Sequence, residues 1–461
     1  MDIDWTTSGL DLYLRAAAGA GRRDGLERGL REAIRAGRLA VGTRLPASRS
    51  LARDLGVSRG TVTHAYAQLV AEGYLIGRHG SGTYVAERAT LATPPPGAPP
   101  RPGPKRPRHD LRPGTPDLTT FPRAAWLAAT RRVLNEAPAE AFGACDPAGR
   151  PELREALAAY LGRARGVVTA PGRLVICNGY AQAINLLARV FADDGHHKAF
   201  AFEDPCLPKL PAAARRAGLA TPVVPVDDEG ARVGDLTADA LVVTPAHQYP
   251  LGVTLSARRR GALVDWTRAT GGLLVEDDYD GEFRYGRQPV GALQGLAPER
   301  VVYAGTASKT VAPGLRLAWL ALPGHLVEPV TRAKEQADRY APVLEQLVLA
   351  DLIDSGGYDR HVRRCRTRYR RRRDRLVTAL AGHVPHLALT GIEAGLHAVL
   401  ELPDAEAENE ARARARRAGV AVDGLADYYA ASAARSGLVI GYGTPPEHGF
   451  APAVDALLKA L

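Results

Sequence analysis

Hydrophobic residues near the start of the chain recur at helical spacing. Within residues 10–40 they predict an amphipathic helix that passes through Leu26, Leu30, Ala33, Ile34 and Leu39. Residues 48–55 carry their apolar side chains on one side and predict a short helix that ends at Gly56. A second helix is predicted from Ser58 to about Glu72. Two short helices joined by a glycine-containing turn predict a helix-turn-helix.

Serine residues stand at the expected starts of both helices. Ser48 follows a Leu-Pro-Ala run and can cap the first helix through its side-chain oxygen, and Ser58 can cap the second. Beyond them, residues 74–76 and 83–85 are β-like and flank a glycine-rich hairpin tip. Helix, turn, helix and hairpin in this order predict a winged helix-turn-helix over residues 1–85.

Residues 86–110 interrupt the hydrophobic pattern. Their sequence, AERATLATPPPGAPPRPGPKRPRHD, is rich in proline and nearly free of large apolar residues, so it cannot form a core. It predicts an extended, semi-rigid linker that at about 3.1 Å per residue spans on the order of 75 Å. Its basic residues favour a solvated tether, with DNA contact as the alternative.

From Leu111 onward, short apolar runs alternate with helical segments. The strand candidates are Leu174–Cys177, Ala199–Phe202, Ala240–Thr244, Leu273–Glu276, Val301–Ala304 and Leu317–Leu322. Helices are expected between them, for example over Gln182–Phe191 and Ala257–Thr270. The alternation predicts an α/β domain with a largely parallel sheet over residues 111–330. Residues 331–461 change to long helices and a few strands, which predicts a smaller α+β lobe.

The composition narrows the class of protein. A chain of 461 residues is expected to form two or three domains, and a formal net charge of +10 favours an anionic partner. The four cysteines have no CxxC spacing, so we predict neither a disulfide framework nor a metal site. The start of the chain has no secretory leader pattern, and no apolar run reaches about 18 residues. These features predict a cytoplasmic protein without a membrane partner.

Charged donors, hydroxyl groups and glycines gather on the side of the winged helix that is expected to face outward. Such groups hold phosphates and read base edges, and glycine lets a wing approach a groove closely. We predict contacts with double-stranded operator DNA through Arg44, Ser48, Arg49, Ser58, Arg59, Thr61, Thr63, His64, Arg78, Gly80, Ser81 and Gly82. The alternative is a small helical domain with a basic surface.

A family resemblance is visible at this point. The runs LPASRSLARDLGVSRGTV, AYAQLVAEGYL and GSGTYV resemble the winged helix-turn-helix of GntR-type bacterial regulators. The resemblance implies a transcription regulator that binds DNA.

Three strand ends in the α/β region carry reactive or polar residues, and ligands of open α/β sheets gather at such ends. Asp277 follows one strand, Lys309 follows another among small hydroxyl residues, and Gly179 opens a helix after a third. A lysine amine forms Schiff bases, and a carboxylate can pair with a pyridinium nitrogen. A helix N-terminus together with Arg316 can hold a phosphate. The set suits pyridoxal 5′-phosphate (PLP), although a single lysine after a strand is more often a surface residue.

Together the three strand ends resemble the fold-type-I aminotransferase pattern. The runs VEDDYDGEFRY and GTASKTVAPGLRLAW resemble the C-terminal domain of MocR-type regulators, which join a GntR-type winged helix to an aminotransferase-like domain. The resemblance covers nearly the whole chain. It implies that Lys309 forms the Schiff base with PLP, that Asp277 pairs with the pyridinium and that Tyr279 donates to the ring oxygen. The other implied cofactor contacts are Gly179, Tyr180, Ala181, Leu207, His247, Gln248, Tyr249, Thr306, Ser308 and Arg316.

Several residues depart from the family pattern. Leu207 stands where an aromatic ring is expected to stack on the cofactor, and Phe142 stands where a tyrosine hydroxyl is expected. Tyr180 replaces a small polar residue, and the strand at residues 437–442 lacks an arginine for a substrate carboxylate, since Arg435 is out of register. These departures favour a domain that senses a ligand over one that transaminates it.

The segment from Arg363 to Arg375 contains nine arginines in thirteen residues. They cover more than one face of a predicted helix. A solvated or dimer-facing helix is one interpretation, and a second contact with DNA is the other.

We therefore expect a homodimeric, non-enzymatic transcription regulator that senses PLP, or an amine or amino acid that exchanges with Lys309. The linker would relay a ligand-dependent shift to the winged helices. One alternative is an active aminotransferase with a vestigial DNA-binding domain. Another is a regulator whose large domain has lost PLP and only dimerises.

Overall fold

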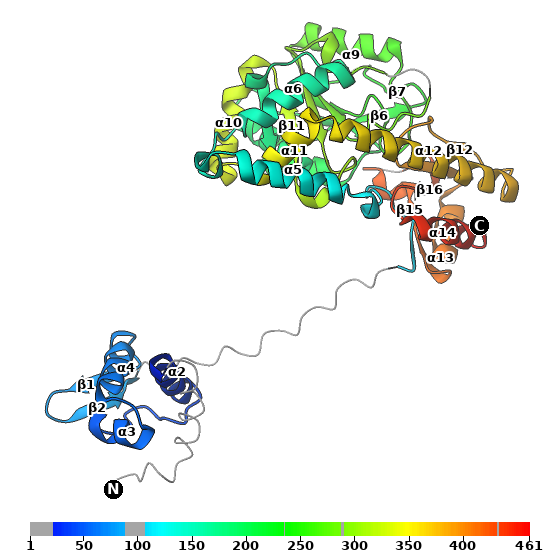
Figure 1. The fold of residues 1–461 in the computed structure, drawn as a ribbon. Coiled ribbons are helices and arrows are strands. Elements are labelled where there is room, and N and C mark those ends of the chain that lie inside the picture. Colours follow the sequence, from blue (N-terminus) through cyan, green and yellow to red (C-terminus); the bar gives the residue numbers. More distant parts are fainter. Residues whose placement is uncertain (1–21, 88–106, 235, 287–289, 431–432) are drawn as a thin grey trace. The chain divides into compact units, whose positions relative to one another are not determined.

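The computed structural model describes residues 22–87, 107–234, 236–286, 290–430 and 433–461. The chain forms two compact units, Met1–Lys105 and Arg106–Leu461 (Figure 1). Most of the predicted linker and the predicted helical residues before Arg22 lie outside the described residues.

The first unit is a winged helix-turn-helix, as predicted. Its elements are α2 (Arg22–Arg35), α3 (Ser48–Leu55), α4 (Arg59–Ala71), β1 (Leu75–Arg78) and β2 (Gly82–Val85). The two strands pair antiparallel from Leu75 opposite Val85 to Arg78 opposite Gly82 and form the wing. Apolar residues from all three helices and both strands form one core, which includes Ile34, Leu51, Val62, Leu69 and Val85. The hydrophobic spacing seen in the sequence is thus the pattern of this core.

The two predicted serine caps differ in the structure. The Ser58 side chain accepts a hydrogen bond from the Thr61 backbone N–H at 3.1 Å and caps α4, as predicted. The Ser48 cap was predicted wrongly, because Ala47 occupies the N-cap position of α3 and no side chain caps that helix. Ser48 is already the first helical residue, whereas a capping residue needs a backbone outside the helical region.

Replacing Ser58 with Ala is expected to destabilise α4 by about 1 kcal/mol, because the Thr61 N–H loses its side-chain acceptor. The same replacement at Ser48 serves as the matched control and should change stability little. Hydrogen exchange of α4 amides in the full chain measures the difference. Equal protection in the two variants would contradict the cap assignment.

The second unit is built on a mixed eight-stranded sheet with the order β4-β11-β10-β9-β8-β5-β6-β7. The central pairs, β10 with β9, β9 with β8, β8 with β5 and β5 with β6, are parallel. In contrast, β11 pairs antiparallel with both β10 and β4, and β7 pairs antiparallel with β6. The strands are β4 (Leu174–Cys177), β5 (Phe200–Asp204), β6 (Val223–Asp227), β7 (Gly230–Ala231), β8 (Ala240–Val243), β9 (Leu273–Asp278), β10 (Val301–Thr306) and β11 (Ala318–Ala321).

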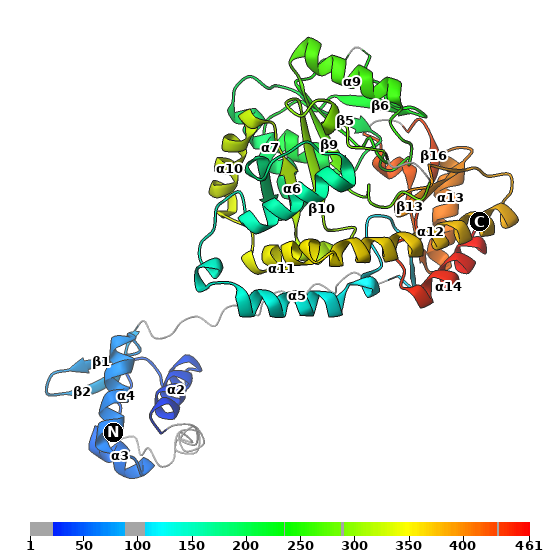
Figure 2. The same cartoon turned by 45° about the horizontal axis from the view of Figure 1, so that its top comes forward.

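Helices cover both faces of this sheet (Figure 2). The helices of this part are α5 (Arg123–Glu136), α6 (Pro151–Arg165), α7 (Tyr180–Asp193), α8 (Lys209–Arg216), α9 (Ala257–Thr270), α10 (Gly324–Asp338), α11 (Val343–Asp354) and α12 (Gly357–His383). On one face α7, α8 and α10 pack against strand residues such as Phe202 and Val302. On the other, α6, α11 and α12 pack against residues such as Ile176 and Trp319, and α9 covers the rest. Strands buried on both faces explain the near-continuous apolar runs in the sequence.

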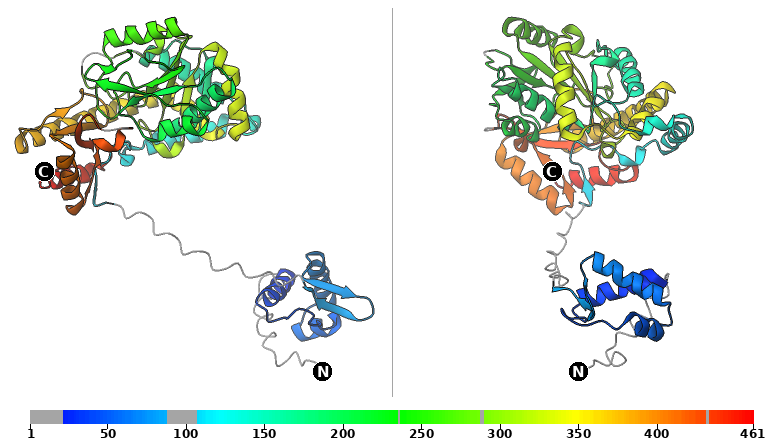
Figure 3. Two further views of the ribbon diagram at one scale, coloured as in Figure 1. Left: turned by 180° about the vertical axis from the view of Figure 1, so that it is seen from behind. Right: turned by 90° about the vertical axis from the view of Figure 1, so that its left-hand side faces the viewer.

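A small lobe completes the second unit and lies beside the large sheet (Figure 3). Its main sheet is antiparallel with the order β12-β13-β16-β15, and β14 pairs with β3 at the start of the unit. The elements are β3 (His109–Asp110), β12 (Leu389–Thr390), β13 (His397–Leu402), α13 (Ala405–Arg417), β14 (Val420–Ala421), β15 (Asp423–Gly424), β16 (Ser436–Gly441) and α14 (Glu447–Leu458).

The packing of side chains in the two cores shows that the large part and the small lobe meet within α12. The predicted boundary at residue 330 lies inside α10, where Val330 packs into the core of the large sheet. Within α12, Val362 belongs to the core of the large part and Leu376 to the core of the lobe. Leu111, which was assigned to the large domain, also packs into the core of the lobe. Such long-range packing is not visible in local sequence patterns.

Candidate functional site

A cavity of about 500 Å³ lies at the carboxyl ends of β9 and β10, where ligands of open α/β sheets bind. This volume is in the range of small-molecule sites. Ten of the residues predicted to contact the cofactor line it: Tyr180, Ala181, Leu207, Tyr249, Asp277, Tyr279, Thr306, Ser308, Lys309 and Arg316. The fold therefore brings together side chains that are far apart in the sequence.

Lys309 and Asp277 are two of the titratable residues that line the cavity. The Lys309 ammonium donates a hydrogen bond to the Gly114 carbonyl oxygen. Burial lowers the pKa of Lys309, while the charges of Asp280 and Asp277 act in the opposite direction. Burial also raises the pKa of Asp277 to about 8. A lysine with a lowered pKa has more of the neutral amine that can attack a carbonyl carbon at neutral pH.

Two buried polar atoms on the cavity wall have no hydrogen-bond partner within the described residues. They are Oδ1 of Asp277 and the hydroxyl oxygen of Tyr180. The Tyr180 hydroxyl is near enough to oppose the rise in the pKa of Asp277, but the two groups do not meet at hydrogen-bonding geometry. Leaving such groups unpaired costs about 1–3 kcal/mol each, so a ligand with a matching polar atom would be favoured there. A pyridinium N–H would supply a charged donor to Asp277.

The N-terminus of α7 forms the other end of the cavity. Gly179 has φ 86°, and a β-carbon at this position would lie 2.4 Å from an Arg316 guanidinium nitrogen. The Arg316 Nη2 donates to the Asn178 carbonyl oxygen at 2.6 Å, which holds the guanidinium across the start of the helix. A cation beside the free N–H groups of a helix start attracts anions such as phosphate. Gly179 is thus required by the close approach of Arg316, although it does not itself line the cavity.

Two hydroxyl residues lie at the end of β10, where Thr306 is the last residue of the strand and Ser308 belongs to the turn that follows. The Thr306 and Ser308 hydroxyl oxygens are 2.9 Å apart, and the Ser308 N–H donates to Thr306 Oγ1 at 3.1 Å. This turn places both hydroxyls next to Lys309 and within the cavity wall. They can donate hydrogen bonds to phosphate oxygens once a ligand replaces their mutual contact.

His247 lies behind the cavity rather than in its wall, so the structure does not place it among direct ligand contacts. Gln248 does not line the cavity either, and its side-chain amide donates to the Pro205 carbonyl oxygen at 2.8 Å. The His247 Nδ1 is 2.9 Å from the Asp280 carboxylate and 3.0 Å from the Tyr279 hydroxyl. A carboxylate oxygen accepts hydrogen bonds, so a hydrogen on Nδ1 would be shared between the Asp280 carboxylate and the Tyr279 hydroxyl oxygen. In that arrangement the Tyr279 hydroxyl oxygen accepts from His247 Nδ1.

His397 completes this buried polar cluster. His247, Asp280 and His397 offer ligand atoms that lie within 4.8 Å of one another, a spacing that could also suit a metal ion. However, His397 Nε2 is 2.9 Å from the Pro250 carbonyl oxygen, and His247 Nδ1 is shared as described. Burial lowers the pKa of His397 to about 3, which keeps this ring neutral. Hydrogen bonds thus occupy His397 Nε2 and His247 Nδ1, whereas the buried His247 Nε2 has no partner within the described residues.

The positions that depart from the family pattern are also placed. Leu207 lines the cavity and is 39% exposed, so an apolar side chain replaces the ring at this wall. Phe142 is 46% exposed. Arg435 is engaged by Asp228 and Glu401, and it does not line the cavity. It is therefore not positioned to receive a substrate carboxylate.

Some site residues were missed by the sequence analysis. Gly114, the acceptor for Lys309, comes from a loop just after the predicted linker, and no local motif marks it. Asp280 belongs to the same EDDYDGE run as Asp277, so its charge was a usable signal. His397 lies in a strand of the small lobe, and only the packing of the lobe brings it near His247 at 5.0 Å between ring centres.

The residues predicted to contact DNA lie on the surface of the first unit. Ten are exposed, and Ser48 and Thr61 are half-buried. On the wing, the Arg78 guanidinium lies 4.9 Å from the centre of the Tyr84 ring, and Ser81 Oγ is 2.7 Å from the Tyr84 hydroxyl. Ser58 and Thr61 are 2.9 Å apart through their hydroxyl oxygens. Arg49 and Arg59 have no side-chain partner within the described residues, whereas Ser58 is already used as a cap.

The chain matches two family models. That of the bacterial regulatory proteins of the gntR family matches residues 23–85, and that of aminotransferase class I and II matches residues 112–436. The chain is 34% identical over 432 residues to the HTH-type pyridoxine biosynthesis transcriptional regulator PdxR of Corynebacterium glutamicum, covering 91% of each chain. It is 33% identical to the probable rhizopine catabolism regulatory protein MocR of Rhizobium meliloti, covering 90% of this chain and 88% of that protein.

Solved structures resemble the second unit. An archaeal alanine:glyoxylate aminotransferase superposes with a TM-score of 0.71 at 27% identity, covering 77% of this chain and 91% of its own. The α-aminoadipate aminotransferase LysN of Thermus thermophilus was solved with N-(5′-phosphopyridoxyl)-L-leucine. It superposes with a TM-score of 0.69 at 26% identity, covering 76% of this chain and 91% of its own.

Within the described residues, no helix combines the length and the apolar character needed to cross a membrane. The winged helix-turn-helix and the aminotransferase fold occur here in the same order as in full-length regulators that the chain matches over nine-tenths of its length. The chain therefore belongs to the MocR type of GntR-family transcription regulators, which carry an aminotransferase class I and II domain.

Proposed function

We propose that this regulator holds PLP in the cavity at Lys309 and uses its occupancy, or an amine that displaces Lys309, to control DNA binding. The observation that carries the proposal is the pairing of Lys309 with an unsatisfied, buried Asp277 in one cavity of about 500 Å³. The similarity to a regulator of pyridoxine biosynthesis, and to LysN with its phosphopyridoxyl ligand, supports it.

The residues of the cavity divide the work of binding such a cofactor. When bound, PLP supplies an aldehyde that condenses with an amine, releasing water, and a ring that withdraws electrons. Asp277 would accept from the ring nitrogen, and Tyr279, held by His247 and Asp280, would donate to the ring oxygen. Arg316 and the start of α7 would hold the phosphate.

The same geometry supports sensing over catalysis. An amino acid substrate needs a cation for its carboxylate, yet Arg435 is engaged by Asp228 and Glu401. We propose that any turnover is residual and that the regulatory output comes from different affinities of the ligand for two arrangements of the protein.

We further propose that the protein acts as a homodimer. Within the second unit, Leu127 and Leu134 are 55% and 54% exposed at a spacing of two helical turns on α5. Large apolar side chains repeated along one exposed helix face favour a protein contact. A dimer would present two winged helices to a repeated operator.

The DNA-binding part is tested by replacing Arg49 and Arg59 with Ala. Both side chains are exposed on the helix-turn-helix, and each is expected to cost about 1–3 kcal/mol of binding energy if it reads a base. Mobility-shift titration on the DNA upstream of the protein's own gene measures this. Arg28→Ala, on the exposed side of α2, is the matched control. Unchanged affinity in the Arg49 and Arg59 variants would remove them from the interface.

A further inference from the structure

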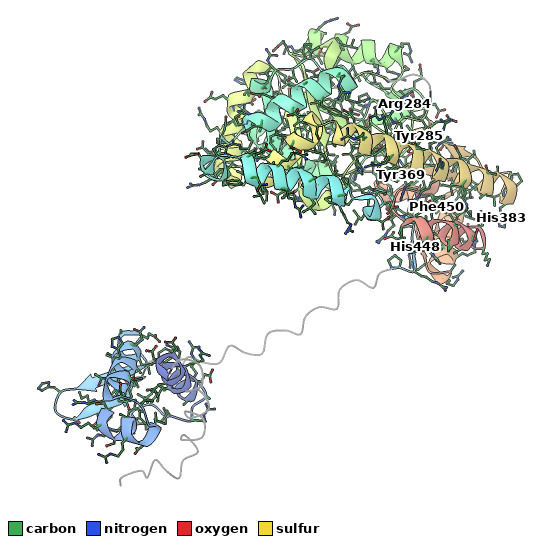
Figure 4. All side chains as sticks on the ribbon, in the orientation of Figure 1. Arg284, Tyr285, Tyr369, His383, His448 and Phe450 are labelled. Atoms are coloured by element: carbon green, nitrogen blue, oxygen red, sulfur yellow. The ribbon has the colours of Figure 1, made fainter. Side chains whose placement is uncertain are left out.

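The arginine-rich helix α12 has an inner and an outer side. Its inner residues, Tyr358, His361, Val362, Cys365, Tyr369, Arg372, Leu376 and Leu380, are buried against the large part and the small lobe. Figure 4 shows Tyr369 of α12 and Phe450 of α14 where the helix meets the lobe. Because buried positions recur at helical spacing, the remaining positions form one continuous outer side.

Four of the nine arginines between Arg363 and Arg375 are used inside the fold. Arg372 is 3% exposed and pairs with Asp117 at 2.7 Å and Glu447 at 2.9 Å. The others bind protein oxygens as well: Arg366 donates to the Glu282 carbonyl, Arg368 pairs with Asp117 and Glu447, and Arg373 pairs with Glu393. The internal structure of the second unit accounts for these four charges.

The other five arginines have no such explanation. All five are exposed, and none has an ion pair or a side-chain hydrogen bond within the described part of the chain. The same holds for Arg360, one turn earlier on the helix. Together these six residues form the outer basic face: Arg360, Arg363, Arg364, Arg370, Arg371 and Arg375. They lie within about 140° of the helix circumference and along about 22 Å of its axis. Asp374 is the one carboxylate in that arc of α12.

The unpaired arginines of the outer basic face destabilise α12 when no anion is bound to them. Cations three or four residues apart on a helix repel one another and destabilise it. Elsewhere in the described second unit, many surface arginines have carboxylate partners, for example Arg132 with Asp351 and Arg163 with Asp359. A polyanion would relieve the repulsion along the whole outer basic face.

We propose that the outer basic face of α12 is a second, sequence-independent contact with the phosphate backbone of DNA. Guanidinium groups bind phosphates bidentately, and double-stranded DNA carries about one negative charge per 1.7 Å of its axis. The winged helix on the same chain brings DNA within reach of a tethered second unit, which raises the effective concentration for a weak contact. This inference rests on the proposed DNA-binding function.

The salt dependence of DNA binding by the full-length protein tests the proposal. Arg363, Arg370 and Arg371 are replaced with Gln, which has a similar helix propensity. The slope of log K against log salt is expected to fall by about 0.9 for each phosphate that is no longer neutralised, and so by about 2.7 for the three replacements together. Binding to operator and to unrelated duplex should weaken alike, because phosphate contacts carry no sequence information.

The matched control replaces Arg416, Arg417 and Lys459 with Gln. These cations are exposed on α13 and at the end of α14, and their replacement changes the net charge equally. A slope that is unchanged in the α12 variant, or that falls equally in the control, would overturn the proposal. So would a change from dimer to monomer in the α12 variant by sedimentation, since that result assigns the face to a second copy of the chain.

The two sets of variants separate this inference from the proposed function. If the unaltered protein binds no DNA, the proposed function fails. A second outcome is that the unaltered protein binds DNA and the Arg49 and Arg59 variants lose specificity, while the α12 variant keeps the salt slope of the unaltered protein. In that case only the second contact is refuted. Residual binding to unrelated duplex in the Arg49→Ala, Arg59→Ala background, abolished by the α12 replacements, is the strongest supporting result.

Discussion

Replacing Lys309 with Ala is expected to abolish covalent capture of PLP. Lys309 is the cavity lysine that lies at the end of β10, beside Asp277 and the two hydroxyls of the following turn. Without its amine no carbon–nitrogen bond can form with the aldehyde, and the visible absorption of the complex should disappear. Borohydride reduction followed by mass spectrometry should find the cofactor on the peptide of the unaltered protein that contains Lys309 and on no peptide of the variant.

Lys209 is the matched control, since its side chain lines the same cavity from α8. The Lys209→Ala variant should keep the covalent adduct, because it retains the Lys309 amine. The two lysines line the same cavity and differ in their position within it. An adduct that survives in Lys309→Ala, or that is lost in Lys209→Ala alone, would show that the wrong amine has been assigned.

Replacing Asp277 with Asn is expected to remove most of the stabilisation that PLP gives the protein. In the unaltered chain the buried carboxylate has an unpaired oxygen, and a ring N–H would satisfy it with a charge-assisted hydrogen bond. An amide is neutral and cannot stabilise a protonated ring nitrogen. Thermal unfolding with and without PLP should therefore show a large rise in Tm for the unaltered protein and a small one for the variant.

The pH dependence of the stability of the ligand-free protein independently checks the burial of Asp277. The pKa of Asp277 is raised from 3.8 to about 8, so its contribution favours the folded state below about pH 4 and is lost as the pH rises through about 8. The loss is at most on the order of 5 kcal/mol. The Asn variant should not show this component, and its stability relative to the unaltered protein should increase across that pH window.

Glu276 provides the matched control for Asp277. It is the neighbouring buried carboxyl in β9, burial raises its pKa to about 7, and it accepts from the Leu293 and Gln294 N–H groups instead of lining the cavity. Glu276→Gln should alter the pH dependence of folding but leave the PLP-induced rise in Tm intact. A loss of that rise in both variants would mean that general destabilisation, not the hydrogen bond of Asp277, is responsible.

Short-range patterns in the sequence were sufficient to predict most helices and strands and many of the residues that line the cavity. The spacing of Leu30, Ile34, Val62 and Leu69 followed the core of the winged helix, and each predicted strand of the α/β region is present. Strand order was not visible in this way, because β11 pairs antiparallel between two strands that are far from each other in the sequence. The Ser48 cap failed for a smaller reason, since one residue of offset decides whether a side chain can cap.

By itself the sequence determined the two-unit organisation, the winged helix-turn-helix and the motif residues Lys309, Asp277 and Arg316, because these depend on short-range spacing and on residue type. Only the tertiary structure decided what those residues contact. It placed Gly114 against Lys309, set His247 behind Tyr279, and engaged Arg435 away from the cavity. It also separated the arginines of α12 into an inner and an outer set, since burial and pairing depend on which side of a helix meets the core.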